Sequence, residues 1–185
     1  MSDRVAVWEI ALADGRHILE FEHGTTTGKR VVIVDGKEIM RKDWMFKLVG
    51  SETFNIGKVK CTISIEAMSG FAYEYLLTIN GKTLKKFAEN QRKISKSWVI
   101  ADLDGQPIRV ALEKDTMDVY VNGKRMETTG EFVDDGTETS FAIAHGHSAF
   151  IKATTTGKKR DGIVHDLYVD DIRIEPEPDP WADYR

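Results

Sequence analysis

The sequence predicts an all-β chain built of two tandem antiparallel β-sandwich domains. Three observations lead to this fold class. Apolar and polar residues alternate with a period of two over many short stretches. Tight-turn dipeptides separate these stretches at regular intervals. The turns of the first half return in the same order about 90 residues later, so the chain is an internal repeat of one domain.

The turn signals come in three matched pairs. They are Asp14-Gly15 with Asp104-Gly105, Asp35-Gly36 with Asn122-Gly123, and Asn80-Gly81 with Asp170-Asp171. Asp-Gly and Asn-Gly favour two-residue type I′ hairpin turns, because both central residues of that turn need a positive φ. Asp170-Asp171 is the weakest of the six signals, since neither of its residues is a glycine.

The strand pattern is clearest between Val59 and Ala67, where every second side chain is apolar and the others are mostly polar. From Phe71 to Ile79 the odd positions are apolar or aromatic and are expected on one core face, and the chain then turns back at Asn80-Gly81. The following segment, AENQRKISK (88–96), is polar, basic and poor in strand-forming residues. It is predicted to be a linker with one helical turn at most, and no longer helix is predicted anywhere.

These assignments place the N-terminal sandwich at residues 1–87, the linker at 88–96, the C-terminal sandwich at 97–174 and an acidic, proline-rich tail at 175–185. The prolines of the tail cannot enter a central strand, so the tail is expected to be extended. Two alternatives stay open for it. It either ends in solvent or docks on a basic stretch that comprises Lys85, Lys86, Arg92, Lys93 and Lys96.

The composition excludes several classes of protein. The net charge is −4 and the pI is near 5.8, so the overall charge does not favour nucleic acid or an acidic membrane as a partner. No apolar run approaches the roughly 18–20 residues that span a bilayer, so membrane insertion is not expected. The N-terminal residues enter a strand pattern without a signal-peptide core, and the single cysteine, Cys61, cannot form an internal disulfide. A cytoplasmic location is therefore predicted.

No catalytic residues and no cofactor are predicted. The chain lacks the G-x-S-x-G nucleophile elbow, and Cys61 lies on the apolar face of its strand, where burial makes a thiol unreactive. The stretch HGTTTGKR (23–30) and its echo TTTGKKR (154–160) do not match the phosphate-binding pattern G-x-x-x-x-G-K-[ST], and no helix pattern follows either. A basic hairpin loop is the preferred interpretation of both.

The motif His145-Gly146-His147 is the best candidate for metal binding, because residues i and i+2 of a strand point to the same side. A stable zinc site needs further ligands, and none is suitably spaced, so a turn explains the motif equally well. His17 and His165 alternate with apolar residues and are expected at the core or its rim. The acidic loop 133–139 lacks the alternating ligands of an EF-hand, and no metal site is predicted.

Trp44 is the one candidate for a partner contact. The charged residues before it place its segment near a surface, and an exposed aromatic side chain is typical of contact sites. Core packing and partner contact are equally compatible with the sequence at this position. Trp8 and Trp98 instead occupy matched positions in the two repeats, which favours matched core roles.

Five long blocks resemble the Fas apoptotic inhibitory molecule family in the same order along the chain. They are FEHGTTTGKRVVIVDGKEI (21–39), DWMFKLVG (43–50), SGFAYEYLLTINGK (69–82), LEKDTMDVYVNGK (112–124) and GEFVDDGTETSFAI (130–143). The resemblance extends from about Val5 to Ile174. It implies two non-enzymatic β-sandwich domains in a soluble cytoplasmic protein that protects cells from Fas-type, death-receptor apoptosis through protein–protein contacts. The expected partners are components of death-receptor or survival signalling, and the family carries no catalytic residues to transfer.

An alternative function is ATP-independent, holdase-like binding of misfolded or aggregating clients under stress, a role also proposed for this family. Two sandwiches offer several strand edges that can pair with an exposed strand of a client. A carbohydrate- or lipid-binding sandwich has only fold analogy in its favour. The acidic tail is additional to the family pattern. The cysteines of vertebrate members near Tyr120 and Phe150 are absent, so cysteine-based regulation is not carried over.

Overall fold

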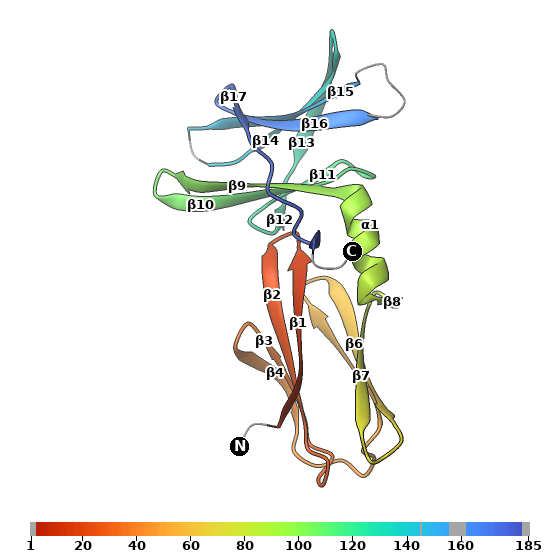
Figure 1. Ribbon diagram of the computed structural model, residues 1–185. Coiled ribbons are helices and arrows are strands. Elements are labelled where there is room, and N and C mark those ends of the chain that lie inside the picture. Colours follow the sequence, from red (N-terminus) through yellow and green to blue (C-terminus); the bar gives the residue numbers. More distant parts are fainter. Residues whose placement is uncertain (1–2, 145, 156–161, 183–185) are drawn as a thin grey trace. The chain divides into compact units, whose positions relative to one another are not determined.

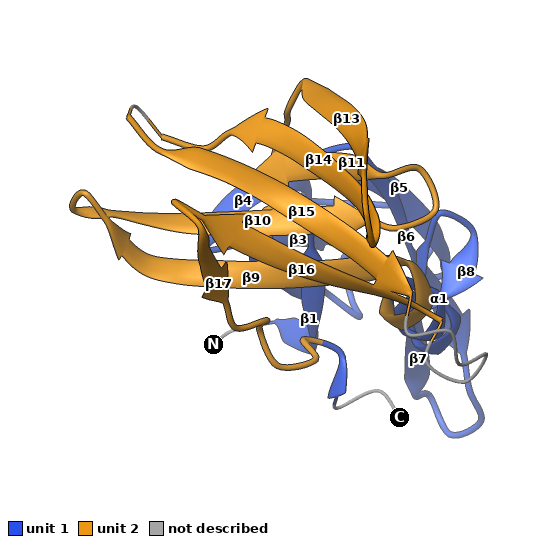
Figure 2. Cartoon of the chain, turned by 90° about the horizontal axis from the view of Figure 1, so that it is seen from above, with its two compact units in different colours: residues 1–12, 16–91, 181–185 blue, residues 13–15, 92–180 orange. Residues whose placement is uncertain are grey.

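The structure is a computed structural model that describes residues 3–144, 146–155 and 162–182. These residues form seventeen β-strands and one helix, most of which are labelled in Figure 1. The chain divides into two compact units, which Figure 2 colours separately: unit 1 comprises residues 1–12, 16–91 and 181–185, and unit 2 comprises residues 13–15 and 92–180. The boundaries predicted from the sequence for the domains, the linker and the tail remain predictions.

Unit 1 contains two four-stranded sheets in which each strand pairs with the next along the chain. The first sheet consists of β1 (Arg4–Leu12), β2 (Gly15–His23), β3 (Arg30–Val34) and β4 (Lys37–Lys42). The second consists of β5 (Gly50–Ile56), β6 (Val59–Ala67), β7 (Tyr73–Ile79) and β8 (Lys82–Thr83).

Unit 2 repeats this arrangement with one additional strand. Its first sheet consists of β9 (Ser95–Leu103), β10 (Gln106–Glu113), β11 (Asp118–Val121) and β12 (Lys124–Arg125). Its second sheet consists of β13 (Thr128–Val133), β14 (Gly136–Ala142), β15 (Ser148–Thr155), β16 (Ile163–Val169) and β17 (Ile172–Ile174).

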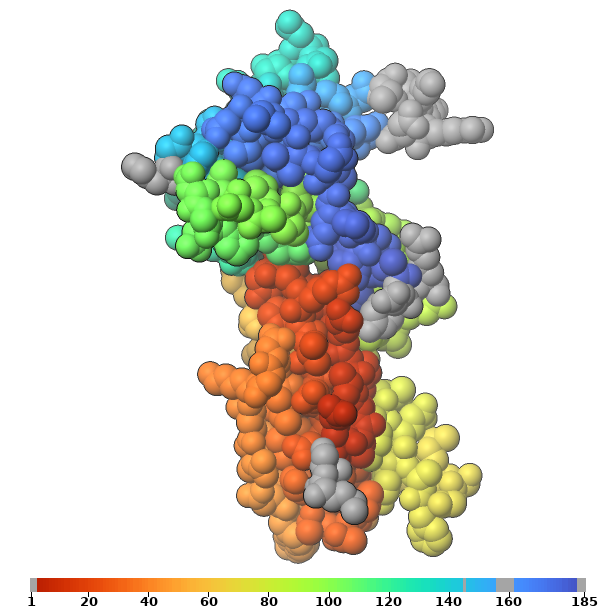
Figure 3. All heavy atoms as spheres, turned by 60° about the vertical axis from the view of Figure 1, so that its left-hand side comes forward, coloured from red at the N-terminus to blue at the C-terminus, as the bar shows by residue number. Residues whose placement is uncertain are grey.

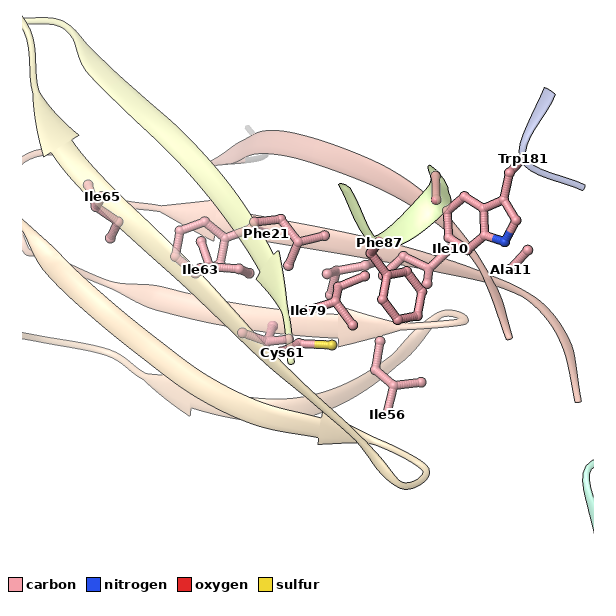
Figure 4. Close-up of a cluster of buried hydrophobic side chains, with 14 residues drawn as sticks. Ile10, Ala11, Phe21, Ile56, Cys61, Ile63, Ile65, Ile79, Phe87 and Trp181 are labelled. Atoms are coloured by element: carbon pink, nitrogen blue, oxygen red, sulfur yellow. The ribbon is translucent and has the colours of Figure 1, made fainter. Parts of the chain in front are cut away.

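In each unit the apolar faces of the two sheets meet in one buried cluster. The cluster of unit 1 joins Phe21 of β2 to Cys61 and Ile63 of β6, as Figure 4 shows. The cluster of unit 2 contains Trp98 of β9 and Ile151 of β15. Alternating strands from two facing sheets therefore bury one side each and leave the other in solvent. The predicted all-β fold with two tandem antiparallel sandwiches is confirmed.

One hydrogen-bonded corner recurs in all four sheets. The first residue of a tight turn has φ between 50° and 52°, and its N–H donates to the carbonyl of a residue in the neighbouring strand at 2.8–2.9 Å. Its side-chain oxygen accepts from the N–H of that same residue at 2.8–3.1 Å. The four pairs are Asp35 with Ile18, Asn80 with Lys60, Asn122 with Arg109, and Asp170 with Ser148.

This corner explains why the turn chemistry repeats. Only Asn and Asp combine tolerance of a left-handed backbone with a short side chain that can bond back to the main chain. Asp170 and Asp171 accordingly both have positive φ, 51° and 64°, even though neither is a glycine. The type I′ prediction is confirmed for five turns. Each half of the chain is itself a pair of similar meanders.

The sixth turn prediction, at Asp14-Gly15, was wrong. The two turn residues are Ala13 and Asp14, and Gly15 already opens β2 with φ of 130°. Asp14 does not have a positive φ. The register of β1 against β2 is set by burial of Ile10 and Leu19 on the core face, because a shift of one residue would expose both.

The prediction that no helix exceeds one turn was also wrong. Helix α1 spans Leu84–Ile94, 11 residues that overlap most of the predicted linker. Phe87 and Ala88 lie on its buried face, and the Thr83 hydroxyl accepts a hydrogen bond from the N–H of Lys86 at its start. The helix depends on this apolar face rather than on its many polar residues, whose number hid the three-to-four-residue spacing in the sequence.

The tail docks, which decides between the two alternatives left open. Arg92 of the predicted basic stretch donates to Asp179 at 2.8 Å. The tail also reaches Arg109, which lies outside that stretch. Trp181 is 2% exposed and packs edge-on against Phe87, with ring centroids 5.6 Å apart, inside the core cluster of unit 1.

Candidate functional site

The connection between β4 and β5, residues 43–49, presents two aromatic rings to solvent; we call it the aromatic loop. Trp44 is 56% exposed and Phe46 is 92% exposed. Their ring centroids lie 4.3 Å apart at an interplanar angle of 77°, the edge-to-face arrangement that aromatic pairs prefer. This exposure excludes core packing for Trp44. Its predicted role in partner contact stays a prediction.

The buried guanidinium of Arg30 holds the aromatic loop from beneath. One terminal nitrogen, Nη2, donates to the carbonyl oxygens of Lys47 at 3.1 Å and Val49 at 2.7 Å. The other, Nη1, donates to the Glu52 carboxylate at 2.9 Å. The rigid fork of an arginine therefore ties two loop carbonyls to strand β5, which limits the conformations open to the loop.

Glu52 shares its carboxylate between two cations. Its side chain is nearly fully buried, as is that of Arg30, and the Lys42 ammonium also donates to both of its oxygens, at 3.0 and 2.8 Å. A buried carboxylate without a partner would raise the free energy of the folded state. The contacts of Glu52 therefore favour one arrangement of the loop more than they add to the free energy of unfolding. The sequence carried a signal for Glu52 alone, which falls on the apolar face of the alternating strand β5 with Phe54 and Ile56. Strand β3 is apolar at every position after Arg30, so its pattern does not single out the arginine.

The connection between β2 and β3 supports the aromatic loop from the side. The N–H of Met45 donates to the Thr27 carbonyl at 2.9 Å. Gly28 has φ of +71°, and a Cβ there would lie only 2.6 Å from the Met45 carbonyl oxygen. The HGTTTGKR stretch is thus a hairpin loop, as predicted, and its second glycine permits a close approach of two backbones. The similar stretch TTTGKKR (154–160) lies largely outside the described residues.

Behind the aromatic loop, His23 is buried among aromatic rings. Its Nδ1 lies 2.7 Å from the Tyr75 hydroxyl, and its ring meets Tyr73 edge-on at 5.1 Å. Burial lowers the pKa of His23, and the positive charge of Arg30 lowers it further. The imidazole is therefore neutral at physiological pH, which leaves Arg30 as the buried cation that faces the loop.

A second loop adds apolar side chains at the same end of unit 1. The β6–β7 connection carries Met68, about half exposed, and Phe71, fully exposed. Both loops leave the same end of one sheet, because Gly50 pairs with Ile65 and Ala67 pairs with Tyr73. In Figure 3 the orange segments of the N-terminal part and the yellow segment near residue 70 both reach the lower end of unit 1.

The predicted histidine motif does not form a metal centre in the part of the chain that the structure describes. His145 lies outside the described residues. His147 approaches two carboxylates, Asp170 Oδ2 at 2.5 Å through Nδ1 and Asp104 Oδ2 at 2.6 Å through Nε2. Because carboxylates only accept, both ring nitrogens must donate, and these hydrogen bonds raise the pKa of His147. Among the described residues no cluster of three His, Cys, Asp or Glu residues suits a metal ion.

The remaining candidates occupy structural positions. Cys61 is buried, and burial raises its pKa to about 11, so it stays a thiol. His165 is buried and its pKa is lowered, mainly by burial, while half-buried His17 lies 2.6 Å from Asp35. Both match the expected core or rim positions. No helix in residues 3–144, 146–155 and 162–182 is long and apolar enough to cross a bilayer.

Residues 4–177 match the family described as Fas apoptotic inhibitory molecule. The chain is 62% identical over 176 residues to Fas apoptotic inhibitory molecule 1 of Bos taurus, which covers 94% of this chain and 87% of the bovine protein. It is 61% identical to the Mus musculus protein and 60% identical to the Homo sapiens protein over the same length, with 97% of each covered. These matches run through both units and agree with the predicted non-enzymatic character. The chain belongs to the Fas apoptotic inhibitory molecule family.

Proposed function

We propose that this protein protects cells from apoptosis triggered by Fas-type death receptors, and that it acts in the cytoplasm through protein–protein contacts rather than by catalysis. The observation that carries the proposal is the 60–62% identity, over 94% of the chain, to proteins named for this inhibition. The partners proposed are components of death-receptor or survival signalling.

The aromatic loop is the contact surface we assign to this function. Trp44 and Phe46 are exposed, and residues of this kind dominate the energetics of protein interfaces. The Arg30 contacts hold the loop in one arrangement, so little conformational entropy would be lost when a partner binds. An ordered, exposed aromatic pair is costly to keep in water unless a partner covers it part of the time.

A cell assay tests the function and the surface together. The wild-type chain and the double variant Trp44→Ala/Phe46→Ala are expressed at equal levels in cells that respond to Fas ligand, and effector caspase activity is measured. We expect wild type to reduce caspase activity and the double variant to lose most of that protection. Both residues are largely exposed, so the double substitution should change the free energy of unfolding little.

Phe132→Ala is the matched control, because Phe132 is 92% exposed, as is Phe46, but lies on β13 in unit 2. It should protect as well as wild type. If wild type gives no protection, the proposed function is wrong for this chain. If the double variant protects fully, the function stands but the aromatic loop is not its contact surface.

The second candidate function is holdase-like binding of aggregating clients without ATP. The observation that favours it is β13, which lies at the edge of its sheet, is exposed along nearly its whole length and carries Phe132. An edge strand presents unpaired backbone groups to which a client strand can add. Such a client would meet an apolar ring beside free hydrogen-bonding groups.

Light scattering of an aggregating client, with substoichiometric protein and no ATP, tests this candidate. Wild type should delay aggregation, and Phe132→Lys should abolish the delay, because a lysine on an edge strand opposes pairing. Trp44→Ala/Phe46→Ala should retain it. A wild-type trace equal to that of an inert protein of similar charge excludes the holdase function, and dependence on Trp44 or Phe46 moves client binding to the aromatic loop.

A further inference from the structure

One glutamate of the acidic tail is held by polar groups of unit 2. The N–H of Glu177 donates to the Ser97 carbonyl at 2.8 Å. Its Oε2 accepts from the Ser97 hydroxyl at 2.8 Å and from Nη1 of Arg109 at 2.5 Å. The side chains of Arg109 and Glu177 are only 14% and 17% exposed, so this ion pair is shielded from water and is stronger than a surface pair.

A second carboxylate follows two residues later. Asp179 Oδ2 accepts from Nε of Arg92, in the last turn of α1, at 2.8 Å. We call Arg92, Ser97 and Arg109 the tail groove. Two arginines thus face two carboxylates spaced i and i+2 along an extended segment, and a proline precedes each acidic residue.

The sheet builds the groove from neighbouring positions. Ser97 pairs with Ala111 and Val99 pairs with Arg109 across β9 and β10, so Ser97 and Arg109 share one face of the sheet. Trp98 and Val110 point the other way, into the core of unit 2. Strand β9 is the last strand of its sheet, and the Ser97 carbonyl at this edge takes its hydrogen bond from Glu177.

The tail leaves part of the groove unused. Arg109 contacts Glu177 through Nη1, while its buried Nε has no hydrogen-bond partner among the described residues. Arginine binds a carboxylate best in the bidentate arrangement, in which two nitrogens donate at once. A buried donor without an acceptor costs free energy that a better-placed carboxylate would recover. A ligand can therefore satisfy this groove more fully than the tail does.

We propose that the tail groove is a recognition site for an acidic, proline-spaced, extended segment of another protein, and that residues 175–179 occupy it in cis. Prolines favour the extended conformation before binding, which reduces the ordering cost for tail and partner alike. A covalently attached tail competes at an effective concentration in the millimolar range, so a partner binds only when it fits better or when the tail is displaced. This site is separate from the aromatic loop, and the inference does not rest on the proposed function.

The test uses the full chain and a fluorescent peptide with the sequence of residues 174–180, IEPEPDP. Its binding is measured by fluorescence anisotropy to wild type and to Glu177→Gln/Asp179→Asn, which weakens the tail contacts and keeps Trp181. We expect a dissociation constant at least tenfold lower for the variant than for wild type. Adding Arg109→Gln to the variant should weaken binding by about tenfold or more. Replacing the peptide residues that correspond to Glu177 and Asp179 by amides should weaken binding to a similar extent.

If the peptide binds equally well to wild type and to the tail variant, the tail does not occupy the groove. If Arg109→Gln does not weaken peptide binding, the peptide binds elsewhere. Either result overturns the proposal. Absence of binding to a folded tail variant at millimolar peptide also overturns it. If the variant does not fold, hydrogen exchange of wild type decides. Excess peptide should accelerate exchange of the Glu177 N–H, which is bonded to Ser97, and unchanged exchange contradicts displacement of the tail.

Discussion

Replacing Trp181 by alanine tests whether a residue close to the C-terminus is part of the core of unit 1. The indole is 2% exposed and lies in one buried cluster with Ile10, Ala11 and Phe87. Figure 4 shows it beside these side chains. The chain reaches this position from the tail, which belongs to unit 2 up to Pro180. Trp181 lies in a turn rather than in a strand, so the burial of its indole contributes directly to its position.

The buried area of the indole gives the expected decrease in unfolding free energy. An aromatic side chain of this size buries about 150–250 Å². At roughly 25 cal/mol per Å² of apolar surface this corresponds to roughly 4–6 kcal/mol, an upper bound because the unfolded chain also buries some surface. Measured Trp→Ala changes in cores cost about 3–5 kcal/mol. We expect a decrease of about 3–5 kcal/mol in the unfolding free energy of unit 1, a large part of the stability of a small domain.

Urea unfolding measures this decrease in unfolding free energy, and hydrogen exchange shows which strands are destabilised. Exchange should accelerate in β6 and β7 of unit 1, while β10 of unit 2 changes much less. Trp181→Phe should lose less than Trp181→Ala because it keeps an aromatic ring, and Phe132→Ala, at an exposed position, should stay within about 0.5 kcal/mol of wild type. A loss below about 1 kcal/mol for Trp181→Ala, with exchange in unit 1 unchanged, would show that Trp181 is not part of the core of unit 1.

Three further predictions concern the loop support and a charged histidine. Gly28→Ala should destabilise the chain by about 1–3 kcal/mol more than Gly36→Ala in thermal unfolding, because both glycines have positive φ but only a Cβ at Gly28 meets a backbone carbonyl. Arg30→Met should cost about 3–5 kcal/mol in urea unfolding and increase tryptic cleavage in the aromatic loop, since Glu52 loses a buried partner; the double variant Arg30→Met/Glu52→Leu should cost less. The raised pKa of His147 contributes stability that is fully present below its ordinary pKa of 6.5 and is lost as pH rises through the raised value. The difference in melting temperature between wild type and His147→Gln should therefore shrink from pH 6 to pH 9, and a constant difference would contradict the charged bridge.

Much of the fold could be read from local chemistry. The alternation in β6 and β7 depends on each residue and its neighbours two positions away, and it identified the buried faces of both strands correctly. It was wrong for Phe71, which precedes β7 in a connection and is fully exposed rather than on the core face. The turn at Asn122-Gly123 is likewise local, because positive φ restricts the residue types that can occupy it. The exposed position of Trp44 was harder to predict. A tryptophan has the same sequence signature on a surface as in a core, and only the packing around the loop decides.

The two-sandwich architecture and its repeat could be predicted from strand patterning and turn chemistry, because both depend on residues close together along the chain. The family followed from the resemblance of long sequence blocks. Local patterns did not predict where helix α1 forms, where the tail docks or how Arg30 holds the aromatic loop. Each of these depends on partners far apart in sequence, such as Phe87 with Trp181 or Arg109 with Glu177. The free energy of such contacts comes from burial and charge pairing between segments that meet only once the sheets have formed.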